Sequence, residues 1–114
     1  MTDLVFPNRQ AYASYIKQLG RSLVIVKAHA KWCGPCRRTD PLVRDLFSKL
    51  RGGPKHLILL DVDENSDVST YLRIRGIPHM MSYVNGEPMD VLSSGDPEQI
   101  KAFFAKVQAR LTAL

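Results

Sequence analysis

The pattern of apolar and polar residues along the 114-residue chain predicts an ordered series of strands and helices. Residues 23–30 and 56–62 form short, nearly continuous apolar runs, which are typical of strands covered on both faces of a sheet. Residues 8–19, residues 34–50 and the segment that begins at Pro97 instead carry apolar residues at the spacing of one helical face. Each of these three segments therefore predicts an amphipathic helix that buries one side.

The second half of the chain also contains a hairpin signal. Asn85-Gly86 separates the predicted strands at residues 80–84 and 89–93, and this dipeptide favours a two-residue turn. A short helix is predicted over residues 67–73. The order of all these elements, which ends in a hairpin and a helix, predicts an α/β fold with a central mixed sheet of about four or five strands, flanked by helices on both faces.

The length of the chain is that of a single domain, so residues 1–114 are expected to form one unit. No apolar run approaches the ~20 residues of a membrane-spanning helix, and no membrane contact is expected. The first residues lack the basic and apolar regions of a signal peptide. A cytoplasmic, reducing location is therefore expected, where a closely spaced cysteine pair is more often catalytic than structural.

The charge of the chain, +5 with an isoelectric point of about 9.5, leaves two interpretations open. One is a generally basic and soluble surface. The other is that Lys31, Arg37 and Arg38, which crowd around the cysteines, attract acidic partners and stabilise a thiolate. The remaining basic residues are dispersed rather than gathered in a stripe with aromatic residues, so no nucleic-acid partner is expected.

The candidate chemistry lies in the only two cysteines of the chain, Cys33 and Cys36, which stand where the predicted strand at residues 23–30 gives way to a helix. The first thiol then lies at a helix N-terminus, where free N–H groups and the helix dipole stabilise a thiolate. Gly34 permits a tight turn, and Pro35 suits the first helical turn. The spacing also lets the two sulfurs form a bridge within one turn, which predicts a redox site.

In this redox interpretation Cys33 is the nucleophile that forms a mixed disulfide with a substrate, and Cys36 is the residue that resolves it. Two alternatives remain open for the pair. The cysteines could be structurally inert, or they could bind a metal if His29 and His79 completed the four ligands that a structural zinc ion needs. The acidic segment at residues 61–65 also has two interpretations, a metal site or a solvated loop that caps the next helix.

Four short motifs in the chain resemble those of one family. They are Trp32-Cys33-Gly34-Pro35-Cys36, Pro41 five residues later, Arg75-Gly76-Ile77-Pro78 and Asn85-Gly86-Glu87. In this order, thioredoxins carry their active-site sequence, a proline that bends the active-site helix, the segment of a cis-proline and a hairpin turn. The resemblance spans roughly residues 22–112 and implies a thioredoxin fold and dithiol–disulfide exchange. It also implies disulfide-containing client proteins and a thioredoxin-reductase-like electron donor as partners, with no bound cofactor.

The resemblance further implies a substrate-binding groove beside the cysteines. In thioredoxins the tryptophan that matches Trp32 packs over the active-site surface, and the proline that matches Pro78 is cis and lies beside the sulfurs. The implied groove residues are Trp32, Gly34, Pro35, Gly76, Ile77, Pro78 and Gly95. A second hypothesis for the function uses the same surface: the chain is a binding module or redox sensor that holds a partner at Trp32, Ile77 and Pro78 with little turnover.

Several positions depart from the thioredoxin pattern. Thioredoxins usually carry a buried aspartate six residues before the first cysteine, where this chain has Lys27, and Leu59 replaces the lysine that pairs with that aspartate. We expect Lys27 to pair with Asp61 or another carboxylate, or to lose its proton, unless it extends to solvent and has no effect. A charged Lys27 would modulate the pKa values of both thiols and make the protein more oxidising than thioredoxin. His29 and His79 replace a tryptophan and a threonine, and either imidazole could transfer protons near neutral pH.

Overall fold

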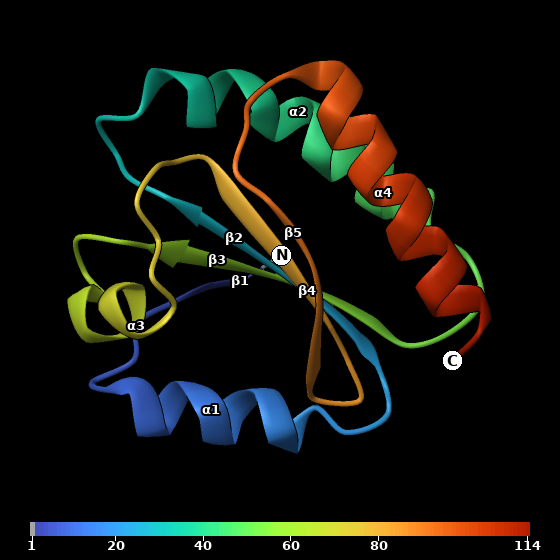
Figure 1. The fold of residues 1–114 in the computed structure, drawn as a ribbon, viewed down its shortest axis with the longest axis horizontal. Helices are drawn as coiled ribbons and strands as arrows, with labels where there is room; N and C mark the ends of the chain where they lie inside the picture. The colour runs from blue at the N-terminus through green and yellow to red at the C-terminus, as the bar shows by residue number, and fades with distance from the viewer. Residues whose placement is uncertain (1) are drawn as a thin grey trace.

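The computed structural model describes residues 2–114, in which a central sheet is covered by helices on both faces (Figure 1). The strands are β1 (Thr2–Leu4), β2 (Leu23–His29), β3 (Lys55–Asp61), β4 (His79–Val84) and β5 (Glu87–Leu92). The helices are α1 (Arg9–Gln18), α2 (Gly34–Ser48), α3 (Ser66–Tyr71) and α4 (Pro97–Thr112). The predicted α/β fold is confirmed. None of these described helices is both long and apolar enough to cross a membrane.

The strands lie in the order β1-β3-β2-β4-β5, so β2 is in the middle of a mixed five-stranded sheet. β2 runs parallel to β3 and antiparallel to β4. This central place explains why β2 is almost continuously apolar, since both of its faces are covered. β1 was not predicted, because an edge strand of three residues is too short to show a period of its own; it pairs with β3 in parallel.

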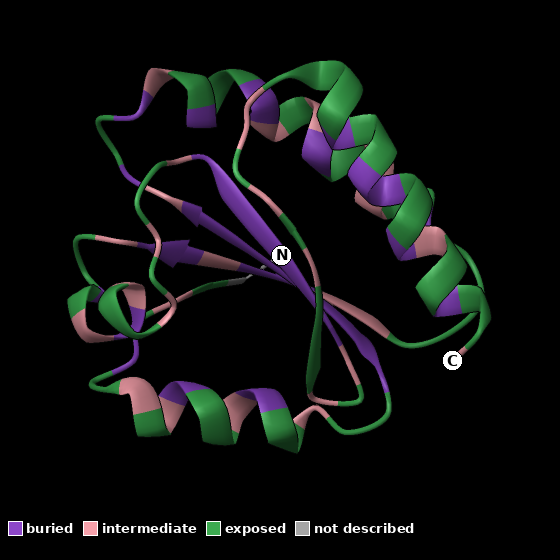
Figure 2. Ribbon diagram, in the orientation of Figure 1, coloured by how far each residue is buried: buried purple, intermediate pink, exposed green. Residues whose placement is uncertain are grey.

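Two hydrophobic cores lie on opposite faces of the sheet. Helices α2 and α4 cover one face, and α1 and α3 cover the other (Figure 1). The helix sides that face the sheet are buried, whereas the outer sides are exposed (Figure 2). The core under α2 and α4 includes Leu23, Ile25, Val43, Leu57, Met80, Phe103 and Phe104, and the other includes Tyr12, Ile16, Val24, Val26, Ile58 and Val68. Successive residues of β2 therefore enter opposite cores, as the alternation of a strand requires.

Local signals begin and end the elements where the sequence predicts. Asn8 caps α1, and its Oδ1 accepts the backbone N–H of Ala11 at 2.9 Å. Gly20 follows the same helix with a φ of 66°, an angle that favours glycine. In the hairpin between β4 and β5, Asn85 and Gly86 both have positive φ, 53° and 83°, as a two-residue turn of this kind requires.

Candidate active site

Cys33 and Cys36 lie at the carboxyl end of β2, where the chain enters α2. The backbone N–H of Val62, directly after β3, donates to the His29 carbonyl oxygen at 2.9 Å, so the two parallel strands end side by side here. The cysteines form a disulfide with their Cα atoms 5.3 Å apart. Both are buried, with exposed fractions of 3% and 2%, and they pack against Val62 and Ile77. The predicted bridge within one helical turn is confirmed.

The first turn of α2 presents a hydrogen-bond donor to Cys33. Cys33 is the N-cap of this helix, and its Sγ accepts the backbone N–H of Cys36 at 3.2 Å. Pro35 occupies the first turn, where its missing N–H removes no intrahelical bond. The Thr39 hydroxyl donates to the carbonyl oxygens of Pro35 and Cys36, at 3.0 and 3.1 Å. Negative charge on the Cys33 sulfur would therefore meet an N–H donor and the positive end of the helix dipole.

A hollow of about 300 Å³ adjoins the disulfide on one side. Its walls are Trp32, Val62, Ser69, Ile74, Arg75, Gly76 and Ile77. Val62 and Ile77 also pack against the cysteines, so the hollow lies next to the sulfurs. Trp32 is 68% exposed, and its Nε1 donates to Asp63 Oδ2 at 2.9 Å, which orients the ring at the rim. The structure thus brings Trp32, Gly76 and Ile77 together around one hollow, as the implied groove requires.

A second hollow, of about 450 Å³, is lined by Pro35, Arg38, Thr39, Gly95 and Pro97. A Cβ atom at Gly95 would lie 3.4 Å from Pro78 Cγ, so this loop passes close to the proline. Pro78 is buried, and the Ile77–Pro78 peptide bond is cis. The Ile77–Pro78 segment therefore connects the two hollows, since Ile77 lines the first and Pro78 contacts the second.

Lys27 lies in the interior beneath the active-site helix. It is 0% exposed, its Nζ donates to the Cys36 carbonyl oxygen at 3.0 Å, and it forms an ion pair with Asp40. The expectation that Lys27 pairs with a carboxylate is confirmed, but the partner is Asp40 and not Asp61. The Asp61 carboxylate instead accepts the backbone N–H groups of Asp63 and Glu64, at 2.9 and 3.4 Å. The alternative that Lys27 extends to solvent is also wrong, because its side chain is enclosed between β2 and α2.

Asp40 is the residue near the cysteines that the sequence reasoning missed. It follows Cys36 by four residues on α2, a spacing that places two side chains on the same face of a helix. That spacing was the available signal, since the carboxylate had to lie on the same side of α2 as the second cysteine. Its recognition also required knowing that this side of α2 packs over Lys27, which only the tertiary structure shows.

The two histidines lie in separate environments. His29 Nε2 is 3.7 Å from Asp3 Oδ1 and, among residues 2–114, has no hydrogen-bond partner. His79 is buried, its Nδ1 has no partner in that same part of the chain, and burial lowers its pKa. The His79 imidazole is therefore neutral at neutral pH. No group of three or more His, Cys, Asp and Glu residues in positions 2–114 could hold a metal ion, and the disulfide favours the redox interpretation of the cysteines.

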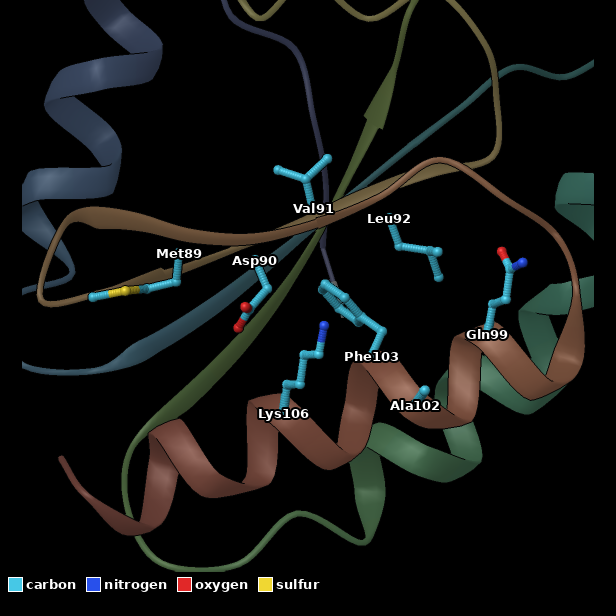
Figure 3. A pocket seen from close by; sticks show the side chains of 8 residues that line it. All are labelled: Met89, Asp90, Val91, Leu92, Gln99, Ala102, Phe103 and Lys106. Carbon is cyan, nitrogen blue, oxygen red and sulfur yellow. The ribbon is translucent and has the colours of Figure 1, made fainter.

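Another hollow, of about 410 Å³, lies between β5 and α4 (Figure 3). Its walls are Met89, Asp90, Val91, Leu92, Gln99, Ala102, Phe103 and Lys106. Asp90 pairs with Arg110, whose Nε lies 3.2 Å from the carboxylate. None of the residues predicted for the site lines this hollow, so it belongs to a different part of the surface from the cysteines.

Comparisons with known proteins agree with the geometry of the site. The family model described as Thioredoxin matches residues 3–106. Thioredoxins of Ictalurus punctatus and Gallus gallus are each 31% identical to this chain over 94 residues, which cover 82% of this chain and 88% of the relative. The solved structure of Plasmodium falciparum thioredoxin superimposes with a TM-score of 0.78 at 29% identity, covering 93% of this chain and 98% of that one.

Sequence, fold and site thus point to the same conclusion. The matched region contains the whole sheet from β2 to β5 as well as the strand-to-helix junction that carries the cysteines. The cysteines form a disulfide at the N-terminus of α2, the arrangement that exchange chemistry needs. The chain belongs to the thioredoxin family of dithiol–disulfide oxidoreductases.

Proposed function

We propose that the chain reduces disulfides in client proteins, with Cys33 as the nucleophile and Cys36 as the resolving residue. The observation that supports these roles is the position of Cys33 as the N-cap of α2, with its Sγ 3.2 Å from the Cys36 N–H. A thiolate is stabilised at that place. The hollow beside it gives a client chain room to lie along Trp32 and the Ile77–Pro78 segment.

The reaction has two steps. The Cys33 thiolate attacks one sulfur of the client disulfide, so that a Cys33–client disulfide forms and the other client sulfur leaves as a thiolate. Cys36 then loses its proton, and its thiolate attacks Cys33 Sγ, which releases the second client thiolate and closes the Cys33–Cys36 disulfide. The client gains two electrons, and its thiolates take up the Cys36 proton and one proton from solvent.

The oxidised chain then needs an electron donor, which we assign to a thioredoxin-reductase-like partner protein. Neither step involves a bound cofactor on this chain, since both are exchanges between sulfur atoms. The same proposal places the chain in a reducing cytoplasm as a single working domain over residues 1–114. The two cysteines of the chain lie together at the site and do not cross-link distant segments, which supports the assignment to a reducing location.

An insulin-reduction assay with dithiothreitol tests the function against the binding-module alternative. We expect the chain to accelerate insulin precipitation catalytically, with many turnovers per molecule. The reason is that both steps use groups already in place at the end of α2. A single stoichiometric burst without turnover would support the binding module or redox sensor instead.

The charge around the hollows supports a preference for acidic clients. Arg75 lines the hollow beside Trp32, and Arg38 lines the hollow beside Gly95. Within residues 2–114 neither arginine forms an ion pair, whereas the nearby Lys31 faces Glu64 at 3.6 Å. The two guanidinium groups are therefore free to pair with carboxylates that flank a client disulfide.

Arg38→Glu and Arg75→Glu should each raise the KM for a disulfide peptide with acidic flanks about two- to fivefold, since one exposed ion pair contributes about 0.2–1 kcal/mol. The kcat should change little, and the effect should shrink as the ionic strength rises. Arg44→Glu is the matched control. Arg44 is exposed on α2, the helix that also carries Arg38, but it lines neither hollow. Equal KM changes in all three variants would contradict the preference and leave only an effect of net charge.

A further inference from the structure

The ion pair between Lys27 and Asp40 has no role in the two steps described so far. Lys27 is 0% exposed, whereas the Asp40 side chain is 32% exposed, so the pair links the interior under Cys36 to the surface. The strand neighbours of Lys27 in register are Leu59 and Met80, both apolar. Among the described residues, the one carboxylate that pairs with this ammonium group is therefore Asp40, which α2 supplies.

We propose that Asp40 is a positioning residue for the exchange reaction: it fixes the Lys27 ammonium group against the Cys36 carbonyl oxygen and cancels its charge, so that the site remains a reductant. This inference rests on the proposed exchange between Cys33 and Cys36. It does not depend on which clients the chain reduces. Asp40 acts on the sulfurs through Lys27, whose Nζ lies 3.0 Å from the Cys36 carbonyl oxygen.

The charge balance of the two redox states explains the effect. In the oxidised state the disulfide is neutral, and the ammonium and carboxylate groups sum to zero. Without Asp40, the oxidised state would contain an uncompensated buried cation, which is unfavourable. A thiolate formed in the reduced state would compensate the charge of that cation. Removal of Asp40 therefore favours the reduced protein and makes it a stronger oxidant. In this proposal the Asp40 carboxylate therefore opposes the oxidising effect that a charged Lys27 is expected to have.

The same balance sets the pH dependence of the resolving step. Cys36 must lose its proton before it attacks Cys33, and a nearby carboxylate opposes that loss whereas a nearby ammonium group favours it. The proton and the charges are shared by neighbouring groups, so the measured midpoint belongs to the site and not to one residue. Other ionisable groups on this side of the sheet include Asp3, His29, Lys55, Asp61 and Asp90, and they are the same in every variant below.

The test compares Asp40→Asn, Lys27→Met and the double variant by stopped-flow reaction of the reduced protein with 5,5′-dithiobis(2-nitrobenzoate). The second thionitrobenzoate is released when Cys36 attacks the mixed disulfide on Cys33, so its rate reports the resolving step without any client. For Asp40→Asn the pH–rate profile should move to lower pH. On the rising limb of the profile the rate should be about tenfold higher, which is the lower end of the effect expected of a charge about 4–6 Å away. For Lys27→Met the profile should move to higher pH, and the double variant should lie close to the original protein.

Equilibration with glutathione supplies a second readout. The equilibrium constant of Asp40→Asn should shift about tenfold toward the reduced protein, which corresponds to a potential about 30 mV less negative. Lys27→Met should shift it in the opposite direction by a smaller factor, because a thiol that is already protonated senses the remaining carboxylate weakly. Asp45→Asn is the matched control, since Asp45 forms an exposed pair with Lys49 on the same helix, at 3.0 Å. It should change neither readout.

The directions in which the pH–rate profiles shift decide whether Asp40 has the proposed positioning role. Profiles that shift in the same direction for Asp40→Asn and Lys27→Met, or an Asp40→Asn variant that matches Asp45→Asn, would overturn the positioning role. If Lys27→Met does not fold, the comparison of the two aspartate variants still decides. Failure of insulin reduction would instead count against the proposed function, because both readouts here use small disulfides.

Discussion

Cys36→Ser is expected to stop exchange at the mixed disulfide, whereas Cys33→Ser is expected to form no covalent complex at all. Turnover of insulin should fall to the uncatalysed background in both variants. The difference follows from the geometry, because the Cys33 sulfur lies at the N-terminus of α2 and Cys36 lies inside its first turn. Loss of Cys36 therefore spares the first attack and removes only the attack that releases the client.

Non-reducing gel electrophoresis and mass spectrometry of the trapped species measure this difference. Cys36→Ser should yield a covalent complex in which the client sulfur is bonded to Cys33. Dithiothreitol should separate this complex by reducing the mixed disulfide. Brief alkylation of the reduced original protein should label Cys33 before Cys36, because the thiolate is the form that reacts. The double variant Cys33→Ser/Cys36→Ser is the control for non-covalent binding. A complex trapped by Cys33→Ser, or preferential alkylation of Cys36, would reverse the two roles.

Asn65→Ala is expected to lower the free energy of unfolding by about 3 kcal/mol, since three hydrogen bonds, two of them buried and one partly buried, contribute about 1 kcal/mol each. Asn65 is 1% exposed. Its Oδ1 accepts the Phe6 N–H at 2.7 Å, and its Nδ2 donates to the carbonyl oxygens of Leu4 and Asp61, at 3.1 and 3.0 Å. The residue therefore ties the end of β1 to the loop after β3, and that loop carries one wall of the Trp32 hollow.

Urea unfolding, followed by the fluorescence of the only tryptophan, measures the loss. Asn8→Ala is the matched control, because it also removes an asparagine hydrogen bond, but from an exposed helix cap, and should lower the free energy by about 1 kcal/mol. Asn65→Ala should also change the tryptophan signal of the folded state, since Asp63 in the same loop accepts the Trp32 Nε1–H. Equal losses in the two variants would show that burial of Asn65 adds nothing.

Much of the fold could be predicted because it depends on local patterns. The apolar runs at β2 and β3 and the helical spacing in α1, α2 and α4 each arise from one face that must be buried. Asn8, Gly20 and Asn85-Gly86 act within a few residues of their own position, so their effect can be read from the chain alone. β1 was missed because three residues at a sheet edge carry no such pattern.

The cysteine pair could also be predicted, whereas its surroundings could not. Cys33 and Cys36 are three residues apart at a strand-to-helix junction, so sequence alone determines that they meet and that Cys33 takes the N-terminal place. The partner of Lys27 depends instead on how α2 packs across β2, and this packing selects Asp40 rather than Asp61. Likewise the two hollows join segments that lie far apart along the chain, such as Trp32 with Gly76 and Pro35 with Gly95. Contacts of this kind result from the packing of whole elements, which short-range patterns in a single sequence do not specify.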